Sequence, residues 1–168
     1  YLLATETDPA RRAYVLNHFL EDFRTTVFRQ TLFAEFERKA HELESAGTPL
    51  TADCLNGIYA ELEKTYYSAA KMQDVVAVEW SYIPHFYRAF YVYQYATGFS
   101  AAVAIASHIL ETGDTAGYLR FLTTGGSDYP LEELKLAGID LTSPTVVGNA
   151  MRVFDKTIDE LAAVLVKE

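Results

Sequence analysis

The sequence predicts an all-α protein, a helical bundle in which residues 1–168 form a single helical unit. Apolar residues recur at steps of three and four along most of the chain, which is the spacing of one helix face. No stretch alternates apolar and polar residues between hairpin turns, so no segment requires a β-strand. The connections that contain glycine and proline are short enough to join neighbouring helices.

The first long helix is expected from Asp8-Pro9 to Ala46-Gly47. Asp8 is a typical N-cap, proline suits the first helical position, and Gly47 allows a left-handed end. Thr25-Thr26 is predicted to be a bend. The apolar face of this helix comprises Val15, Phe19, Phe23, Val27, Phe28, Leu32, Phe33 and Phe36.

Further helices are expected along the rest of the chain. Thr51 resembles a second N-cap, for a helix that continues to about Tyr67. The pattern weakens over residues 68–83 and is helical again from Pro84 to about Leu110.

Short helices are expected near the C-terminal end, before one last long helix. They cover residues 115–122 and 131–136, with Gly125-Gly126-Ser127 as the turn between them. Ser143-Pro144 begins the final helix. Its apolar residues are Val147, Met151, Phe154, Ile158, Leu161 and Leu165.

Charge and composition exclude several classes of function. The net charge of −9 disfavours nucleic-acid binding, which depends on clustered Lys and Arg. No apolar run reaches the ~20 residues of a membrane span. Cys54 is the single cysteine, which rules out an intrachain disulfide, favours a cytoplasmic location and indicates a small buried thiol.

The histidines do not form a metal site that can be recognised from spacing. A zinc helix would carry two histidines one turn apart with Glu after the first, but His41-Glu42 is followed by Ser45 where the second ligand should be. His18, His85 and His108 match the pattern no better. No metal is therefore expected on this chain.

The segment from Trp80 to Tyr95 is unusually rich in aromatic residues, and it reads WSYIPHFYRAFYVYQY. On a helix that begins at Pro84, one stripe would hold Phe86, Phe90, Tyr93 and Thr97, and a second would hold Tyr87, Tyr91 and Tyr95. The phenylalanines suit a core. Phenolic hydroxyls need hydrogen bonds or water, so the tyrosines suit the wall of a cleft, beside which His85 could donate to an oxyanion.

The stretch IPHFYRAFYVYQYATG, residues 83–98, resembles the signature of oligoendopeptidase F and its relatives among thermolysin-type zinc peptidases. The likeness extends, in the same order, to residues 23–37 (FRTTVFRQTLFAEFE), 47–51 (GTPLT) and 118–140 (YLRFLTTGGSDYPLEELKLAGID). It covers essentially the whole chain.

This resemblance implies that the chain is the C-terminal part of a larger zincin-like catalytic domain. The family's zinc helix and third ligand, a glutamate, would lie upstream of Tyr1, which opens the chain without methionine. Zinc would then be bound by residues outside this chain, and the isolated segment would be inactive. Its partners would be an oligopeptide substrate and the upstream polypeptide, with no nucleic acid and no membrane.

The resemblance also implies roles for individual residues. His85 and a nearby tyrosine, Tyr93 first and Tyr91 second, would be catalytic by hydrogen-bonding the tetrahedral oxyanion or the substrate backbone. Tyr87 and Tyr95 would contact substrate. Two other functions stay open on the residues alone: a non-catalytic helical binding module with an aromatic ligand cleft, and a helical oligomerisation unit.

Overall fold

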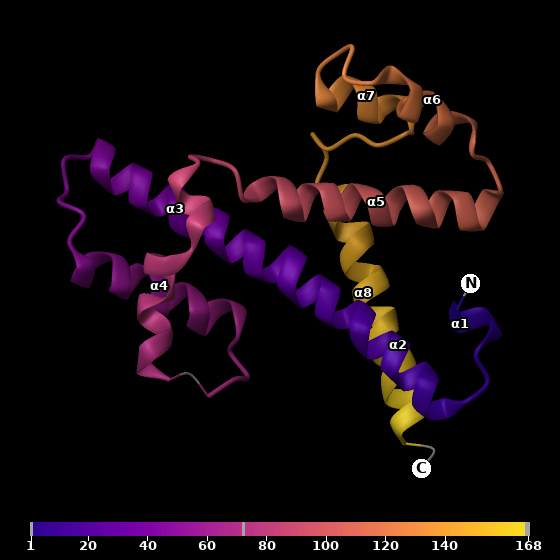
Figure 1. Cartoon of the computed structure of the whole chain (residues 1–168), viewed down its shortest axis with the longest axis horizontal. Helices are drawn as coiled ribbons and strands as arrows, with labels where there is room; N and C mark the ends of the chain where they lie inside the picture. The colour runs from indigo at the N-terminus through magenta and orange to yellow at the C-terminus, as the bar shows by residue number, and fades with distance from the viewer. Residues whose placement is uncertain (1, 72, 167–168) are drawn as a thin grey trace. The chain divides into compact units, whose positions relative to one another are not determined.

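The computed structural model describes residues 2–71 and 73–166, and every regular element in this part of the chain is helical (Figure 1). The chain divides into two compact units. Unit 1 comprises Tyr1–Phe23 and Thr97–Glu168, and unit 2 comprises Arg24–Ala96. The all-α prediction is confirmed. The prediction that residues 1–168 form a single helical unit stays a prediction; a single cooperative unfolding transition would support it.

Unit 2 is formed by α3 (Arg29–Ser45), α4 (Ala52–Tyr66) and the 3₁₀ helices η2 (Asp74–Tyr82) and η3 (Pro84–Tyr87). Both α3 and η2 pack on α4. Thr51 caps α4 through a side-chain bond to the Cys54 N–H at 3.2 Å, as the sequence predicts. The core consists of Leu32, Phe33, Phe36, Tyr59, Leu62, Ile83 and Val92.

Unit 1 contains the short α1 (Leu2–Thr5), α2 (Pro9–Asp22), α6 (Ala116–Thr124), α7 (Pro130–Leu136) and α8 (Thr145–Leu165). It also contains most of α5 (Tyr93–Thr112). Helices α2 and α8 pack along one another (Figure 1). Its aliphatic core cluster is Ala101, Ile105, Ile139 and Val146.

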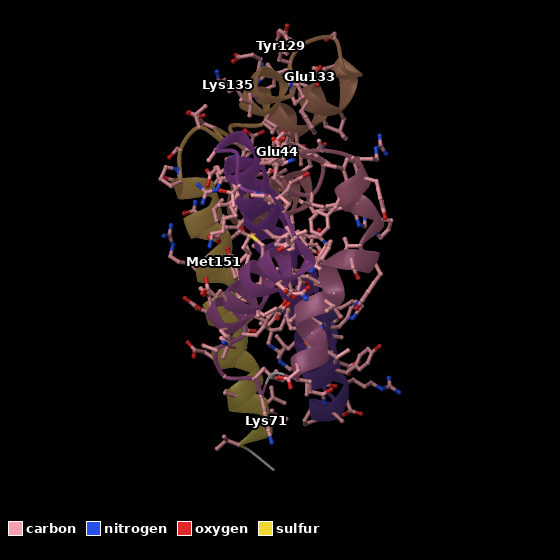
Figure 2. The ribbon with its side chains drawn as sticks, turned by 90° about the vertical axis from the view of Figure 1, so that its left-hand side faces the viewer. Glu44, Lys71, Tyr129, Glu133, Lys135 and Met151 are labelled. Atoms are coloured by element: carbon pink, nitrogen blue, oxygen red, sulfur yellow. The ribbon has the colours of Figure 1, made fainter. Side chains whose placement is uncertain are left out.

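Helices α6 and α7 form a close pair within unit 1. A β-carbon on Gly117 would lie 2.7 Å from the Leu136 carbonyl oxygen, so this contact requires glycine. The turn between them has positive φ at Gly125 (59°) and Gly126 (81°), which glycine adopts readily. Figure 2 labels Tyr129, Glu133 and Lys135 in and beside α7.

Two predicted elements differ in detail from the structure. Thr25-Thr26 lies in η1 (Phe23–Phe28), which is a π-helix, so the chain stays helical where a bend is expected. The continuous helix predicted from Pro84 to Leu110 is wrong over residues 88–92, which separate η3 from α5 in a non-helical turn. This turn shapes the candidate site.

Candidate functional site

The turn between η3 and α5 has a strained residue at its centre. Among the residues that the structure describes, Phe90 is the one non-glycine with positive φ, at 56°. The Tyr91 N–H donates to the Arg88 carbonyl at 3.2 Å, which makes Phe90 the third residue of a turn. That position accepts positive φ when it is glycine or asparagine, whereas a bulky side chain there is uncommon.

Glu37 on α3 explains why the helix is interrupted at this turn. Its side chain is only 6% exposed, and its carboxylate accepts the Phe90 N–H at 2.7 Å. In a continuous helix that N–H would donate to the carbonyl four residues earlier. Sequence reasoning missed Glu37, although its place four residues after Phe33 puts a charge on the buried stripe of α3.

The turn brings together three of the five predicted site residues, His85, Tyr91 and Tyr95. The Tyr95 hydroxyl donates to the Tyr91 hydroxyl at 3.3 Å and lies 3.4 Å from His85 Nε2. The His85 and Tyr91 rings stack at 5.9 Å between centroids with planes 11° apart. The Tyr95 ring meets both edge-on, at 5.7 Å from His85 and 5.5 Å from Tyr91. We call these residues the His85–Tyr91–Tyr95 cluster.

The electrostatics of the cluster favour a neutral, donating phenol at Tyr95. The bond that Tyr95 donates to Tyr91 is the largest cause of a raised Tyr95 pKa, and desolvation acts in the same direction. The Arg88 guanidinium lies over the Tyr91 ring, 4.9 Å from its centroid. At neutral pH, the cluster therefore presents hydroxyl groups beside a cation, which suits recognition of a partial negative charge.

The other two predicted residues are close to the cluster in sequence and are exposed to solvent. Tyr87 is 86% exposed and Tyr93, the first residue of α5, is 52% exposed. The two predicted helical stripes are wrong because the chain leaves the helix at residues 88–92. Phe86 packs on the core, whereas Phe90 is 54% exposed and its ring lies 4.6 Å from that of His41.

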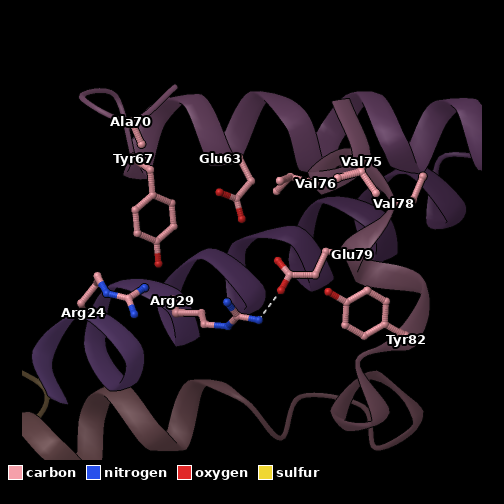
Figure 3. A pocket seen from close by; sticks show the side chains of 10 residues that line it. All are labelled: Arg24, Arg29, Glu63, Tyr67, Ala70, Val75, Val76, Val78, Glu79 and Tyr82. Carbon is pink, nitrogen blue, oxygen red and sulfur yellow. Dashed lines mark hydrogen bonds and ion pairs between the residues drawn. The ribbon is translucent and has the colours of Figure 1, made fainter. Parts of the chain in front are cut away.

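A second polar feature of unit 2 is centred on the buried Glu79 of η2. Its carboxylate pairs with Arg29 of α3 (Figure 3). The same carboxylate accepts a hydrogen bond from the hydroxyl of Tyr59 on α4. Burial is the main reason that the pKa of Tyr59 is raised, and the bond to Glu79 adds to it. The Glu63 pKa is raised by burial first and by the nearby Glu79 charge second.

A pocket of about 360 Å³ lies beside this network, and none of the five predicted site residues lines it. Figure 3 shows Glu63, Tyr67 and Arg29 directed toward the same space. The pocket is lined by Arg24, Arg29, Glu63, Tyr67, Ala70, Val75, Val76, Val78, Glu79 and Tyr82. Sequence reasoning singled out none of the charged residues of this network.

Within residues 2–71 and 73–166, no group of three or more His, Cys, Asp or Glu side chains lies close enough to hold a metal ion. The ligand set of a zinc peptidase is thus not offered by the described residues. Cys54, predicted to be buried, is partly exposed and not disulfide-bonded. No helix of the described chain is long and apolar enough to cross a membrane.

Comparison with known proteins gives consistent matches along the chain. A family model described as Peptidase family M3 matches residues 1–153. The chain is 48% identical to oligopeptidase PepF of Bacillus subtilis over 99% of its own length and 25% of that protein. It is 44% identical to an oligoendopeptidase F homolog of Lactococcus lactis over 99% of its length and 28% of the relative.

Solved structures match as well. The crystal structure of oligoendopeptidase-F from Enterococcus faecium superposes with a TM-score of 0.96 at 47% identity, over all of this chain and 33% of that one. A putative peptidase from Chlamydophila abortus gives a TM-score of 0.89 at 39% identity, over 97% of this chain and 28% of that one. The chain thus spans about a quarter to a third of the proteins it matches.

Proposed function

The chain belongs to peptidase family M3, and on that premise we propose that it is the C-terminal portion of an oligoendopeptidase F-like zinc metallopeptidase. The parent protein hydrolyses peptide bonds in oligopeptides, in the cytoplasm. The printed names of the relatives, oligopeptidase and oligoendopeptidase F, support this substrate class. The chain's length, a quarter to a third of those relatives, supports a parent polypeptide with further segments.

The observation that carries the proposal is the His85–Tyr91–Tyr95 cluster, with the exposed Tyr93 and Tyr87 beside it. In this proposal His85 and Tyr93 donate hydrogen bonds to the oxyanion that develops on the scissile carbonyl. Tyr91 is the second candidate for that donor. Tyr87 and Tyr95 contact the substrate. Fixed donors of this kind stabilise charge that appears in the transition state.

Zinc belongs to the parent protein in this proposal, and its ligands come from the segment upstream of Tyr1. A bound zinc ion would supply a polarised water for attack on the peptide carbonyl. The residues described here would bind and orient the peptide and donate hydrogen bonds to it. The isolated chain is accordingly proposed to be inactive.

The test is the turnover of an oligopeptide by the parent polypeptide carrying His85→Ala or Tyr93→Phe. Each variant is expected to lower kcat/KM by about 100-fold, the usual effect of losing one oxyanion donor. Tyr129→Phe is the matched control, because this tyrosine is 79% exposed in unit 1, and it should retain turnover. If both site variants turned over peptide like the unmodified protein, the assigned roles would be excluded.

The same aromatic cluster would also serve a helical module that binds a ligand without chemistry. Such a module would bind an oligopeptide through Tyr87 and Tyr95, and the parent polypeptide would not cleave it with or without added zinc. Isothermal titration of the peptide, followed by mass spectrometry of the same sample, separates the two functions.

A further inference from the structure

Glu37 has the geometry of a residue that holds the candidate site in shape. It lies on α3 and reaches the turn between η3 and α5 across a sequence separation of 53 residues. Its 2.7 Å bond goes to a backbone N–H, so the bond fixes the path of the chain and not only one side chain.

The residue that Glu37 holds is the strained one. Phe90 has φ of 56°, a conformation that costs energy for a bulky residue and persists only when its surroundings enforce it. His41, one helical turn beyond Glu37, packs its ring on Phe90 at 4.6 Å with planes 31° apart. Helix α3 therefore holds both the backbone and the ring of Phe90.

The strained residue adjoins the cluster directly. Tyr91 follows Phe90, stacks on His85 and accepts the Tyr95 hydroxyl. The buried Val92 then leads into α5, whose first residue is Tyr93. Any change in the backbone of Phe90 must therefore shift Tyr91 against His85, and it must move the start of α5 with Tyr93.

We propose that Glu37 is a positioning residue: by binding the Phe90 N–H it sets the left-handed turn that places Tyr91 and Tyr93 relative to His85. The inference rests on the proposed function for its kinetic consequence, but its structural consequence does not depend on that function. Glu37 touches no substrate in this account. It acts through the turn.

Two conservative variants separate the effect of side-chain length at residue 37 from the effect of its charge. Glu37→Gln keeps an acceptor oxygen at the same length without the charge, and Glu37→Asp keeps the charge one methylene further back. If reach to the Phe90 N–H is what matters, Gln retains the turn and Asp loses it. If the charge alone matters, the order is reversed, and the proposal is wrong.

Amide hydrogen exchange in the parent polypeptide, followed by mass spectrometry, measures how readily the turn opens, independently of catalysis. Glu37→Asp is expected to speed exchange about tenfold or more in peptides that span residues 88–92, because the bonded N–H becomes free to open. Glu37→Gln should stay within about threefold of the unmodified protein. Equal exchange in Glu37→Asp and the unmodified protein would overturn the proposal.

Peptide turnover is the second readout. Glu37→Asp is expected to lower kcat by about 10- to 100-fold with little change in KM. Displaced hydrogen-bond donors weaken contacts that form mainly in the transition state, so substrate binding is little affected. Glu37→Gln should restore kcat. If exchange increased while kcat stayed unchanged, and His85→Ala still lowered turnover by about 100-fold, the positioning role would be excluded. If His85→Ala also had no effect, the proposed function itself would fail.

Glu133 provides a matched control within the same chain. It is a buried glutamate of α7 whose carboxylate accepts a backbone N–H, that of Asp128, at 3.1 Å. It belongs to unit 1, whereas His85, Tyr91 and Tyr95 belong to unit 2. Glu133→Asp should speed exchange around residues 126–130 and leave kcat and KM unchanged. A fall in kcat equal to that of Glu37→Asp would show a general loss of stability and overturn the proposal.

Discussion

The phenols of α4 and those of the His85–Tyr91–Tyr95 cluster have different partners within unit 2. Tyr59 and Tyr66 of α4 each donate to a carboxylate, that of Glu79 and that of Glu35 respectively. In the cluster, Tyr95 donates to another phenol and lies near an imidazole. Each hydroxyl of α4 forms a strong, charge-assisted bond with its carboxylate. The bonds within the cluster are longer and weaker, so a ligand can replace them.

This difference in hydrogen-bond partners distinguishes tyrosines that stabilise the fold from tyrosines that can bind a ligand. A tyrosine that binds a buried carboxylate stabilises the fold, since removing either partner leaves a buried polar group unsatisfied. A tyrosine whose hydroxyl is bonded to another phenol at 3.3 Å contributes little to stability, and a ligand can take the place of that partner. Substitutions in the two regions should therefore differ in what they change, and three predictions test this.

The largest effect is expected for Glu79→Leu. This change removes the carboxylate that pairs with the Arg29 guanidinium and that accepts the hydrogen bond of the buried Tyr59 hydroxyl. The free energy of unfolding should fall by about 2–4 kcal/mol, less than for a fully buried pair because Arg29 is partly exposed. Urea unfolding followed by circular dichroism measures this.

The exposed pair Glu132–Lys135 of α7 serves as the control for that measurement. The Lys135 Nζ and Glu132 Oε1 atoms are 2.7 Å apart, and both side chains are about half exposed. Because surface ion pairs contribute about 0–1 kcal/mol, Glu132→Leu should change stability much less than Glu79→Leu. Equal losses for the two variants would remove the distinction between the α4 network and an ordinary surface pair.

An intermediate effect is expected for Tyr66→Phe, in alkaline solution. Burial first, and the bond to Glu35 second, raise the pKa of Tyr66 from 10.0 to about 12. Since the folded state holds this proton more tightly than the unfolded state, the contribution to stability is complete below pH 10 and is lost as pH rises toward 12. In Tyr66→Phe the free energy of unfolding should therefore decline less steeply with pH over that range. The difference in slope corresponds to the uptake or release of up to about one proton on unfolding. An unchanged slope would contradict the assignment.

Local signals in the sequence account for most of the helices. Asp8 accepts the N–H of Ala10 at 2.9 Å at the start of α2, and Thr51 caps α4, so caps predicted from residue type are confirmed. The turn at Gly125-Gly126 follows from glycine's freedom of φ. These features depend on residues within one or two helical turns, which is why the sequence alone reveals them.

The site was harder to predict because its shape depends on distant partners. Helical periodicity continues through residues 84–97, and only Glu37, 53 residues from Phe90, shows that the helix is interrupted. The Arg29–Glu79 pair likewise spans 50 residues. Spacing correctly grouped Tyr91 with Tyr95 but wrongly placed Tyr87 on the same stripe. No local propensity reports a hydrogen bond between residues so far apart in sequence.

The smallest effect on stability is expected for Tyr91→Phe, which instead changes an ionisation. The phenyl ring can still stack on His85, so the free energy of unfolding should change by less than about 0.5 kcal/mol. The Tyr95 hydroxyl, however, loses the acceptor that does most to raise its pKa, and that pKa should fall toward its ordinary value. Carbon-13 NMR of the Tyr95 ζ carbon follows this titration. Tyr87→Phe, at a side chain 86% exposed, should leave the Tyr95 pKa unchanged. If Tyr91→Phe also left the Tyr95 pKa unchanged, the two phenols would not interact in solution, and the contrast with the tyrosines of α4 would lose its basis.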